Sequence, residues 1–341
     1  MASLSLRDST VIGDYKKPYI VAEVNTSHGG NVESAMAMID KAKEVGCNCV
    51  KFQSWSTNSL YSKSFYEKNP IAKRFVEKYS LSENDLFELA RYCRDQNIAF
   101  ASTPYSRREV DFLVDSCKTP FVKVASMDIN NYPYLDYIAK TGAPIVLSTG
   151  MSEIGEIQRA VSVIENAGNN NICLLHCVSI YPADISTIHL NNIIGLREEF
   201  PQYPIGFSDH TLGIEVATAA TALGAAVIEK HFTLDRKKIG MDNQMAVEPE
   251  EMALLVQSCH NVYLALGSKD RFVSEEEYEQ RKKMRRSIVA VKNLEAGAVI
   301  SGSDLDVKRP GTGLAPEKID TLIGKRLLRS IEADTLLLET D

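Results

Sequence analysis

The stretch PIGFSDHTLGIEVATAATALGAAVIEKH, residues 204–231, sets the pattern from which the fold of this chain can be predicted. It opens with one short apolar run, residues 204–208, and closes with another, residues 226–231. Between them, residues 214–223 carry apolar side chains at helical spacing. Two strands separated by a helix are typical of a parallel pair joined by a crossover helix.

The same pattern recurs along the first 231 residues. Helical periodicity also marks residues 32–45 and 153–167, and a last helix fits residues 248–266. Eight strand–helix units predict a closed (β/α)8 TIM barrel rather than an open doubly wound sheet. The loop after the first strand, VNTSHGG, also lacks the GxGxxG of a nucleotide-binding sheet. The six further strands are predicted at residues 19–23, 49–53, 98–103, 121–126, 144–149 and 172–177.

The composition changes after residue 267. With 341 residues, the chain has room for a barrel and an appendage. We assign residues 1–267 to the barrel domain. Residues 268–286 are almost all charged or polar and predict a linker or an exposed helix. Residues 287–341 contain short β runs and Gly turns, which predict a small β-rich second domain that packing on a partner would help to stabilise.

Bulk composition excludes several classes of function. The net charge of −7 argues against general binding to nucleic acid or to a membrane surface. No apolar run is long enough for a membrane helix, and the N-terminus does not resemble a signal peptide. The seven cysteines form no paired CxxC motifs, which favours buried, reduced thiols over zinc ligands. These observations predict a cytoplasmic protein.

Polar side chains stand at the ends of nearly all the predicted strands. Any one of them could be a cap or a solvated surface residue, but a closed barrel brings the carboxyl ends of all its strands to one mouth. Two lysines and several hydroxyls converging there would form an anion site suited to phosphate. The polar residues at or near these ends include Glu23, Lys51, Gln53, Ser102, Thr103, Lys123, Ser126, Asp128, Ser148, Thr149, Ser179, Tyr181, Ser208, Asp209, Glu229 and Lys230.

Two histidines close neighbouring strands. His210 follows the seventh strand and His231 ends the eighth, so the two imidazoles could share one divalent metal ion in an open, catalytic site. The alternative is a pair of hydrogen-bonded core histidines. His28 follows the first strand and could also face the mouth. His176 lies within a strand, and His189 and His260 are expected on helices, so these three offer no such site.

Motifs along nearly the whole chain resemble the sialic acid (N-acetylneuraminate) synthase family, which includes the legionaminic and pseudaminic acid synthases. The resemblance implies a barrel followed by an antifreeze-like (SAF) domain, and a PEP-dependent synthase that joins phosphoenolpyruvate to an amino-sugar aldehyde and releases phosphate. The acceptor would be N-acetylmannosamine or a 2,4-diacetamido-6-deoxyhexose. The matching motifs include KFQ at 51–53, VKVAS at 122–126, LSTGM at 147–151, GFSDHT at 206–211, EKHFTLD at 229–235 and KRPGTG at 308–313.

The resemblance also implies roles for individual residues. His210 and His231 would hold Mn2+ or Mg2+, and Arg309 of one subunit would reach the active site of its partner in a domain-swapped homodimer. Glu23 and Asp242 would bind the sugar or move a proton. Phosphoenolpyruvate would lie against Lys51, Lys123, Ser126, Ser148 and Ser208, and the sugar would contact Glu23, Gln53, Tyr181 and Asp242. Ser179 occupies a position that is often polar in the family and is expected to bind substrate.

Two stretches depart from the family pattern. The first-strand loop reads Ser27-His28-Gly29-Gly30 where members often have Asn-His-x-Gly, and the eighth-strand loop reads Gly240-Met-Asp-Asn243 where many have Gly-Pro-Asp-His. Because these loops should face the sugar, they indicate an acceptor other than plain N-acetylmannosamine. Related PEP-dependent 3-deoxy-ulosonic acid synthases, class II metal aldolases and a non-catalytic sugar-binding protein are the alternatives.

Overall fold

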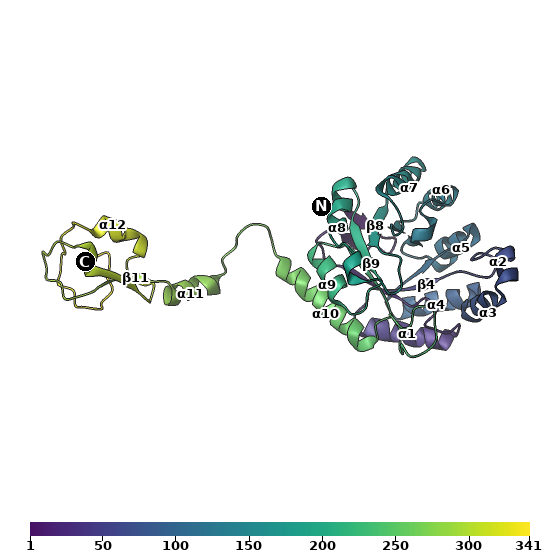
Figure 1. The fold of residues 1–341 in the computed structure, drawn as a ribbon, viewed down its shortest axis with the longest axis horizontal. Coiled ribbons are helices and arrows are strands. Elements are labelled where there is room, and N and C mark those ends of the chain that lie inside the picture. Colours follow the sequence, from purple (N-terminus) through teal and green to yellow (C-terminus); the bar gives the residue numbers. More distant parts are fainter. The chain divides into compact units, whose positions relative to one another are not determined.

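The computed structural model describes residues 1–341, the whole chain, and divides into two compact units, Met1–Gly267 and Ser268–Asp341 (Figure 1). No helix in either unit is long and apolar enough to cross a membrane. All seven cysteines are buried and unpaired.

The first unit is built on one sheet of eight parallel strands. Hydrogen-bonded neighbours follow the order β5-β4-β3-β10-β9-β8-β7-β6. The two outer strands, β5 and β6, also contact one another, which brings the sheet almost to closure as a barrel. The predicted (β/α)8 barrel is therefore confirmed. The strands are β3 (Tyr19–Glu23), β4 (Cys49–Gln53), β5 (Ala99–Thr103), β6 (Val122–Val124), β7 (Ile145–Ser148), β8 (Ile172–Cys177), β9 (Ile205–Asp209) and β10 (Val227–His231).

Helices surround the sheet, as Figure 1 shows. In α1 (Val32–Glu44), the Asn31 side chain accepts the Ser34 N–H at the N-terminus, and the buried face carries Met38 and Ile39. The other helices of this unit are α2 (Lys63–Lys68), α3 (Pro70–Tyr79), α4 (Glu83–Asp95), α5 (Arg107–Asp111), α6 (Tyr132–Lys140), α7 (Ile154–Asn166), α8 (Asn192–Glu199), α9 (Glu215–Ala222) and α10 (Pro249–Leu266). Most of them also bury apolar residues in the large core against the strands, whereas α2 and α3 bury Tyr66, Val76 and Tyr79 in a separate small cluster with Trp55.

Side chains alternate between the inside and the outside of the barrel along each strand. On β10, Ile228 belongs to the large core between strands and helices, whereas Val227 belongs to a smaller core inside the barrel. Lys230 points outward with Ile228 and donates to the Asp209 carboxylate at 2.7 Å. Glu229 and His231 therefore point inward, with Val227.

A hairpin closes the N-terminal end of the barrel. Strands β1 (Ser3–Ser5) and β2 (Val11–Gly13) pair in antiparallel register. Leu4, Leu6 and Ile12 are buried in the same core as the inward residues Val21 and Val227. This apolar packing fills the barrel from below, so polar groups inside it collect at the opposite, C-terminal end.

The second unit has its own small core. Strands β11 (Ser287–Ala290) and β12 (Leu305–Lys308) pair antiparallel, and a short helix, α12 (Ile319–Leu322), follows. The segment predicted as a linker or exposed helix contains α11 (Glu275–Met284), which buries no residue. The core consists of Ile288, Ala290, Leu294, Ile300, Leu314, Leu327, Ile331 and Leu337.

Candidate active site

A cavity of about 640 Å3 opens at the C-terminal ends of the barrel strands. The structure brings into its lining every site residue expected in the barrel unit. Arg309 belongs to the C-terminal unit and is not part of this lining. The predicted residues that line the cavity are Glu23, Lys51, Gln53, Lys123, Ser126, Ser148, Ser179, Tyr181, Ser208, His210, His231 and Asp242.

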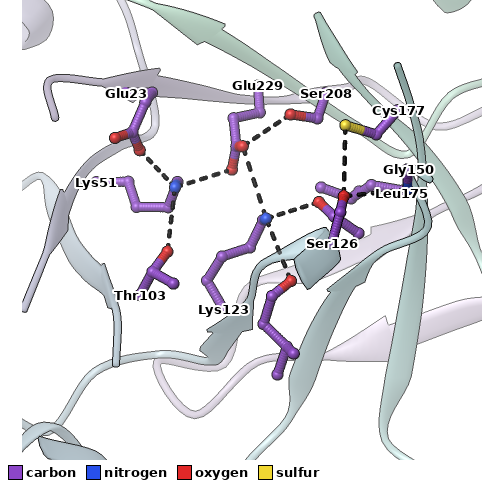
Figure 2. A network of polar contacts seen from close by, with 12 residues as sticks. Glu23, Lys51, Thr103, Lys123, Ser126, Gly150, Leu175, Cys177, Ser208 and Glu229 are labelled. Carbon is purple, nitrogen blue, oxygen red and sulfur yellow. Dashed lines mark hydrogen bonds and ion pairs between the residues drawn. The ribbon is translucent and has the colours of Figure 1, made fainter. Parts of the chain in front are cut away.

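Lys51 lies between Glu23 and Glu229 in the polar network of the cavity, as Figure 2 shows. Its Nζ forms an ion pair with Glu23 and lies 3.6 Å from Glu229 Oε2. It also donates to Thr103 Oγ1 at 3.3 Å. All of these side chains are at least nine-tenths buried, so Lys51 holds its charge in a poorly solvated place only because two carboxylates face it.

Lys123 lies on the other side of Glu229. Its Nζ donates to Ser148 Oγ at 2.7 Å. It also lies 3.7 Å from Glu229 Oε1, a contact that Figure 2 shows. The same carboxylate accepts from Ser208 Oγ at 2.9 Å. Glu229 thus joins the two lysines into one buried polar network in which each charged group has a partner.

Burial and nearby charges shift the pKa values of the two carboxyl groups of this network in opposite directions. Burial raises the pKa of Glu23, and the nearby Lys51 offsets this only in part. Burial would also raise the pKa of Glu229, but the charges of Lys123 and Lys51 outweigh it and lower that pKa. For Lys123, burial lowers the pKa more than Glu229 raises it. Glu229 is therefore the fixed anion, and Glu23 is the carboxyl group better suited to hold a proton.

Close packing shapes the wall beside Lys123. Gly150 N–H donates to Ser126 Oγ at 3.0 Å. A Cβ at position 150 would lie 2.8 Å from that oxygen and would also collide with the Ser179 hydroxyl. The Cys177 thiol lies 3.7 Å from both hydroxyls. Glycine at this point allows Ser126 and Ser179 to face the cavity together.

The two strand-end histidines are neighbours in the cavity lining, with ring centroids 5.4 Å apart. His210 Nδ1 lies 2.7 Å from the Val178 carbonyl oxygen. The carbonyl oxygen can only accept, so Nδ1 carries a hydrogen. Burial lowers the pKa of His210, but the contacts with Cys177 and this carbonyl outweigh it and raise that pKa, so Nε2 becomes an acceptor when the ring gives up its second proton. Burial and the neighbouring His210 lower the pKa of His231 far below its ordinary value, so its ring is neutral. Asp242 Oδ2 lies 3.8 Å from His231 Nδ1.

The remaining histidines lie elsewhere. His28 is 3 % exposed and accepts the Gly30 N–H at Nδ1, so it does not face the mouth as its position allowed. His176 donates from Nε2–H to the Ile188 carbonyl oxygen at 2.6 Å inside the fold. His189, expected on a helix, is exposed between the short 3-10 turn Ile185–Thr187 and α8, and His260 lies on α10 as expected.

Comparison with known proteins identifies the family. Residues 38–271 match the NeuB family, and residues 285–341 match the SAF domain. The chain belongs to the NeuB family. It is 38% identical to the N,N'-diacetyllegionaminic acid synthase of Legionella pneumophila, over 94% of this chain and 93% of that protein. It is 34% identical to the human N-acetylneuraminate-9-phosphate synthase, over 96% of this chain and 93% of that protein.

A solved structure agrees with both sequence comparisons. The sialic acid synthetase of Leptospira borgpetersenii superposes with a TM-score of 0.74 at 32% identity, covering 82% of this chain and 94% of that one. Membership of the NeuB family makes the chain an enzyme, and the named relatives support synthesis of nonulosonic acids as its reaction class.

The two stretches that depart from the NeuB pattern meet in the structure. The Ser27 hydroxyl contacts Asn243 Oδ1, and the Asn25 side chain contacts Asp242. Between them, the Met241 N–H donates to Thr26 Oγ1 at 3.0 Å. Three successive residues of the β3–α1 loop therefore hold three successive residues of the β10–α10 loop, and this contact fixes Asp242 at the edge of the cavity.

Several cavity residues had no role assigned to them from the sequence. Glu229 and Thr103 were expected among the polar residues at the strand ends, and both line the cavity. Strand alternation could have given Glu229 a role, because it lies two residues before His231 on the same face of β10. Asn25, Trp55 and Tyr105 lie in loops, and no periodic signal in the sequence marks them.

Proposed function

We propose that this NeuB enzyme condenses phosphoenolpyruvate with the open-chain form of an acylated amino sugar, releasing phosphate and forming a nine-carbon sugar acid. One observation carries the proposal: a single cavity has two buried lysines among hydroxyl groups on its floor, and two histidines with Asp242 beside them. The lysines suit a small anion with a phosphate and a carboxylate, and the histidines with Asp242 suit a polar acceptor.

The lysines would bind the phosphate and the carboxylate of phosphoenolpyruvate. Charge-assisted hydrogen bonds in a site that excludes water are stronger than neutral ones, so this placement favours tight orientation. Ser126, Ser148 and Ser208 would add hydroxyl donors. When phosphate leaves, the same lysines would stabilise its growing negative charge, which serves catalysis as well as binding.

The donor set fits a divalent metal ion. His231 is neutral, His210 can accept through Nε2, and the Asp242 carboxylate is close by. The protein has no group of three or more His, Cys, Asp or Glu side chains arranged to hold a metal ion. An ion bound by the two imidazoles would therefore keep coordination positions open for water and substrate. We assign His210 and His231 as ligands of Mn2+ or Mg2+, which would polarise the aldehyde of the sugar as a Lewis acid.

The chain's own carboxyl groups would manage charge and protons. C3 of phosphoenolpyruvate forms the new bond to the aldehyde carbon, water adds at C2, and the C–O bond to phosphate breaks. Glu229, held as an anion by both lysines, could stabilise the positive charge that develops at C2. Glu23, whose pKa is raised, could accept or return a proton, or bind a sugar hydroxyl.

The acceptor would be N-acetylmannosamine or, more in keeping with the cavity wall, a 2,4-diacetamido-6-deoxyhexose. The upper wall carries apolar side chains, including Leu60, Met127, Met151 and Met241. The only lysines in the lining are Lys51 and Lys123 on the floor, already paired with carboxylates, and no arginine lines it. Leaving aside any residue that a second copy brings to the cavity, this wall suits methyl and acetyl groups better than a sugar phosphate.

Phosphate release tests the proposal. The purified protein would be mixed with phosphoenolpyruvate, Mn2+ and one acceptor at a time: N-acetylmannosamine, its 6-phosphate, or 2,4-diacetamido-6-deoxyhexoses. We expect phosphate and a product of the mass of the acceptor plus pyruvate. Turnover without phosphoenolpyruvate would point to a class II aldolase instead, and tight sugar binding with no product from any acceptor would point to a binding protein.

Arg309 and the apolar rim support a domain-swapped homodimer in the cytoplasm. Loops around the cavity expose Met151, Ile180, Leu212 and Ile239, each more than half exposed, and we propose that the SAF unit of a second copy covers them and brings its Arg309 to the sugar. All seven thiols being reduced fits the cytosol.

Mixing two inactive variants tests the swap. H231A lacks an assigned metal ligand in its barrel, and R309A lacks the assigned arginine in its SAF unit. After the mixed chains are unfolded and refolded together, swapping would give hybrid dimers with one intact site. We expect about a quarter of wild-type activity, because about half of the dimers would be hybrids. No recovery would show that Arg309 acts within its own chain, and an R309A protein that is active by itself would show that Arg309 is not needed.

A further inference from the structure

The side-chain amide of Gln53 is held by two donors from outside the catalytic network. Gln53 ends β4, and its Oε1 accepts from Trp55 Nε1–H at 3.1 Å and from Tyr105 O–H at 2.7 Å. An indole N–H can only donate, so the atom facing Trp55 must be the oxygen. The nitrogen of the amide then faces the cavity, where Nε2 donates to Glu23 Oε1 at 3.2 Å.

Both donors are themselves fixed. Trp55 is 3 % exposed and packs in a small apolar cluster with Tyr66, Val76 and Tyr79, against which Tyr105 also packs. The Tyr105 backbone N–H donates to the Glu109 carboxylate at 2.6 Å, which holds the start of the loop after β5. Neither ring can turn away without disturbing this cluster, so the orientation of the Gln53 amide is set before any substrate binds.

One amide hydrogen of Gln53 remains for a ligand. Nε2 carries two hydrogens, and Glu23 accepts one of them. The other would meet an acceptor oxygen in the cavity that Gln53 lines, such as a sugar hydroxyl or the carbonyl of an N-acyl group. If the amide could flip, it would present its oxygen to Glu23 and to that same ligand position, where it would repel the Glu23 carboxylate and the carbonyl of an N-acyl group.

We propose that Trp55 and Tyr105 are positioning residues that set the affinity of this enzyme for its acceptor sugar by holding the Gln53 amide in one orientation. The inference rests on the proposed function for the identity of the ligand. Neither ring makes a hydrogen bond to Lys51, Lys123 or the serines of the floor, so the phosphoenolpyruvate side of the cavity is not affected.

Two conservative variants test this role. W55F and Y105F each remove one donor and keep an aromatic ring. We expect each to raise the KM of the acceptor about three- to tenfold, the effect of one hydrogen bond, with the KM of phosphoenolpyruvate nearly unchanged. Y66F is the matched control. It removes a hydroxyl from the same cluster, but that hydroxyl is buried without a hydrogen-bond partner, so the acceptor KM should stay at the wild-type value.

A double-mutant cycle distinguishes positioning from general damage. In a Q53A background, W55F and Y105F should have no further effect on the acceptor KM, because the group they orient is gone. Equal effects with and without Gln53 would overturn the inference. So would a parallel rise in the KM of both substrates, or a rise for Y66F as large as that for Y105F.

A spectroscopic measurement tests the contact without turnover. Trp55 is the only tryptophan of the chain, so the ultraviolet resonance Raman band that reports indole N–H hydrogen bonding reads this contact alone. We expect a bonded indole in the wild type and in Y66F, and a shift toward the free form in Q53A. A free indole in the wild type would refute the inference even if the enzyme proves active, whereas a bonded indole in an inactive enzyme would refute only the proposed function.

Discussion

Acid should weaken the barrel through His28, a residue that takes no part in the proposed chemistry. His28 follows β3 in the loop that holds Asp242, and burial lowers its pKa from 6.5 to about 4, although a hydrogen bond to the Asn25 backbone opposes the shift. In the folded protein its Nδ1 accepts the Gly30 N–H. Protonation at that nitrogen would replace the hydrogen bond with a clash of two N–H groups.

The sign and size of the effect follow from proton linkage. Because the pKa of His28 is lower in the folded state, the neutral histidine contributes fully to stability above pH 6.5, and this contribution is lost as the pH falls through about 4. The shift corresponds to about 3 kcal/mol in total, of which about 2 kcal/mol is lost between pH 7 and pH 4.5. H28Q cannot titrate and should lack this component.

Urea unfolding of the two proteins at pH 7 and pH 4.5 gives the comparison. Fluorescence of the single tryptophan, Trp55, reports the barrel unit. The loss of unfolding free energy in H28Q is subtracted from the loss in the wild type. This difference cancels the contribution of the other titrating groups, which the two proteins share. The wild type should lose about 2 kcal/mol more free energy of unfolding than H28Q on acidification. Parallel losses would refute the reasoning, since they would mean that His28 titrates alike in the folded and unfolded chains.

Three further substitutions test other parts of the structure. H231A should abolish metal-dependent turnover and the electron paramagnetic resonance signal of bound Mn2+. The control variant H189A, at an exposed position, should keep both. Full activity of H231A would show that His231 is not a metal ligand. K123M should raise the KM of phosphoenolpyruvate about ten- to a hundredfold by removing a charged donor, with a smaller effect on the acceptor, and equal effects on both substrates would contradict the placement. K230M leaves Asp209 buried without its partner and should lower the free energy of unfolding by about 3–5 kcal/mol in urea titrations, and a loss below about 1 kcal/mol would show that Asp209 finds another partner.

The strands could be predicted from the sequence because their signal is local. Each barrel strand is a short β-branched run, and the predicted and observed bounds agree within one residue for all but one of them. The exception is β6, predicted over residues 121–126 but observed as Val122–Val124, because the chain turns into a 3-10 turn at Ser126–Asp128. That turn brings Ser126 against Gly150.

Contacts between distant loops could not be predicted in the same way. Gln53 and Tyr105 are 52 residues apart, and Ser27 and Asn243 are 216 apart. Which loops meet depends on the order of strands around the barrel, and which atoms meet depends on loop conformation, for which no periodic pattern exists. The strand-end residues Lys51, Lys123 and His231 were predictable because the barrel fixes where strands end.

The hairpin that fills the barrel from below leaves the cavity with a single entrance. Lys51 and Lys123 are each 3 % exposed at its far end, whereas Tyr181 and Met241 near the opening are about half exposed. Under the proposed assignment, the reactants must enter in sequence, with the phosphate compound first and the sugar stacked above it. The products must leave in the reverse sequence, so the sugar acid departs while phosphate is still held beneath it. Inorganic phosphate would then be the last to go, and it would compete with the next molecule of phosphoenolpyruvate for the empty enzyme.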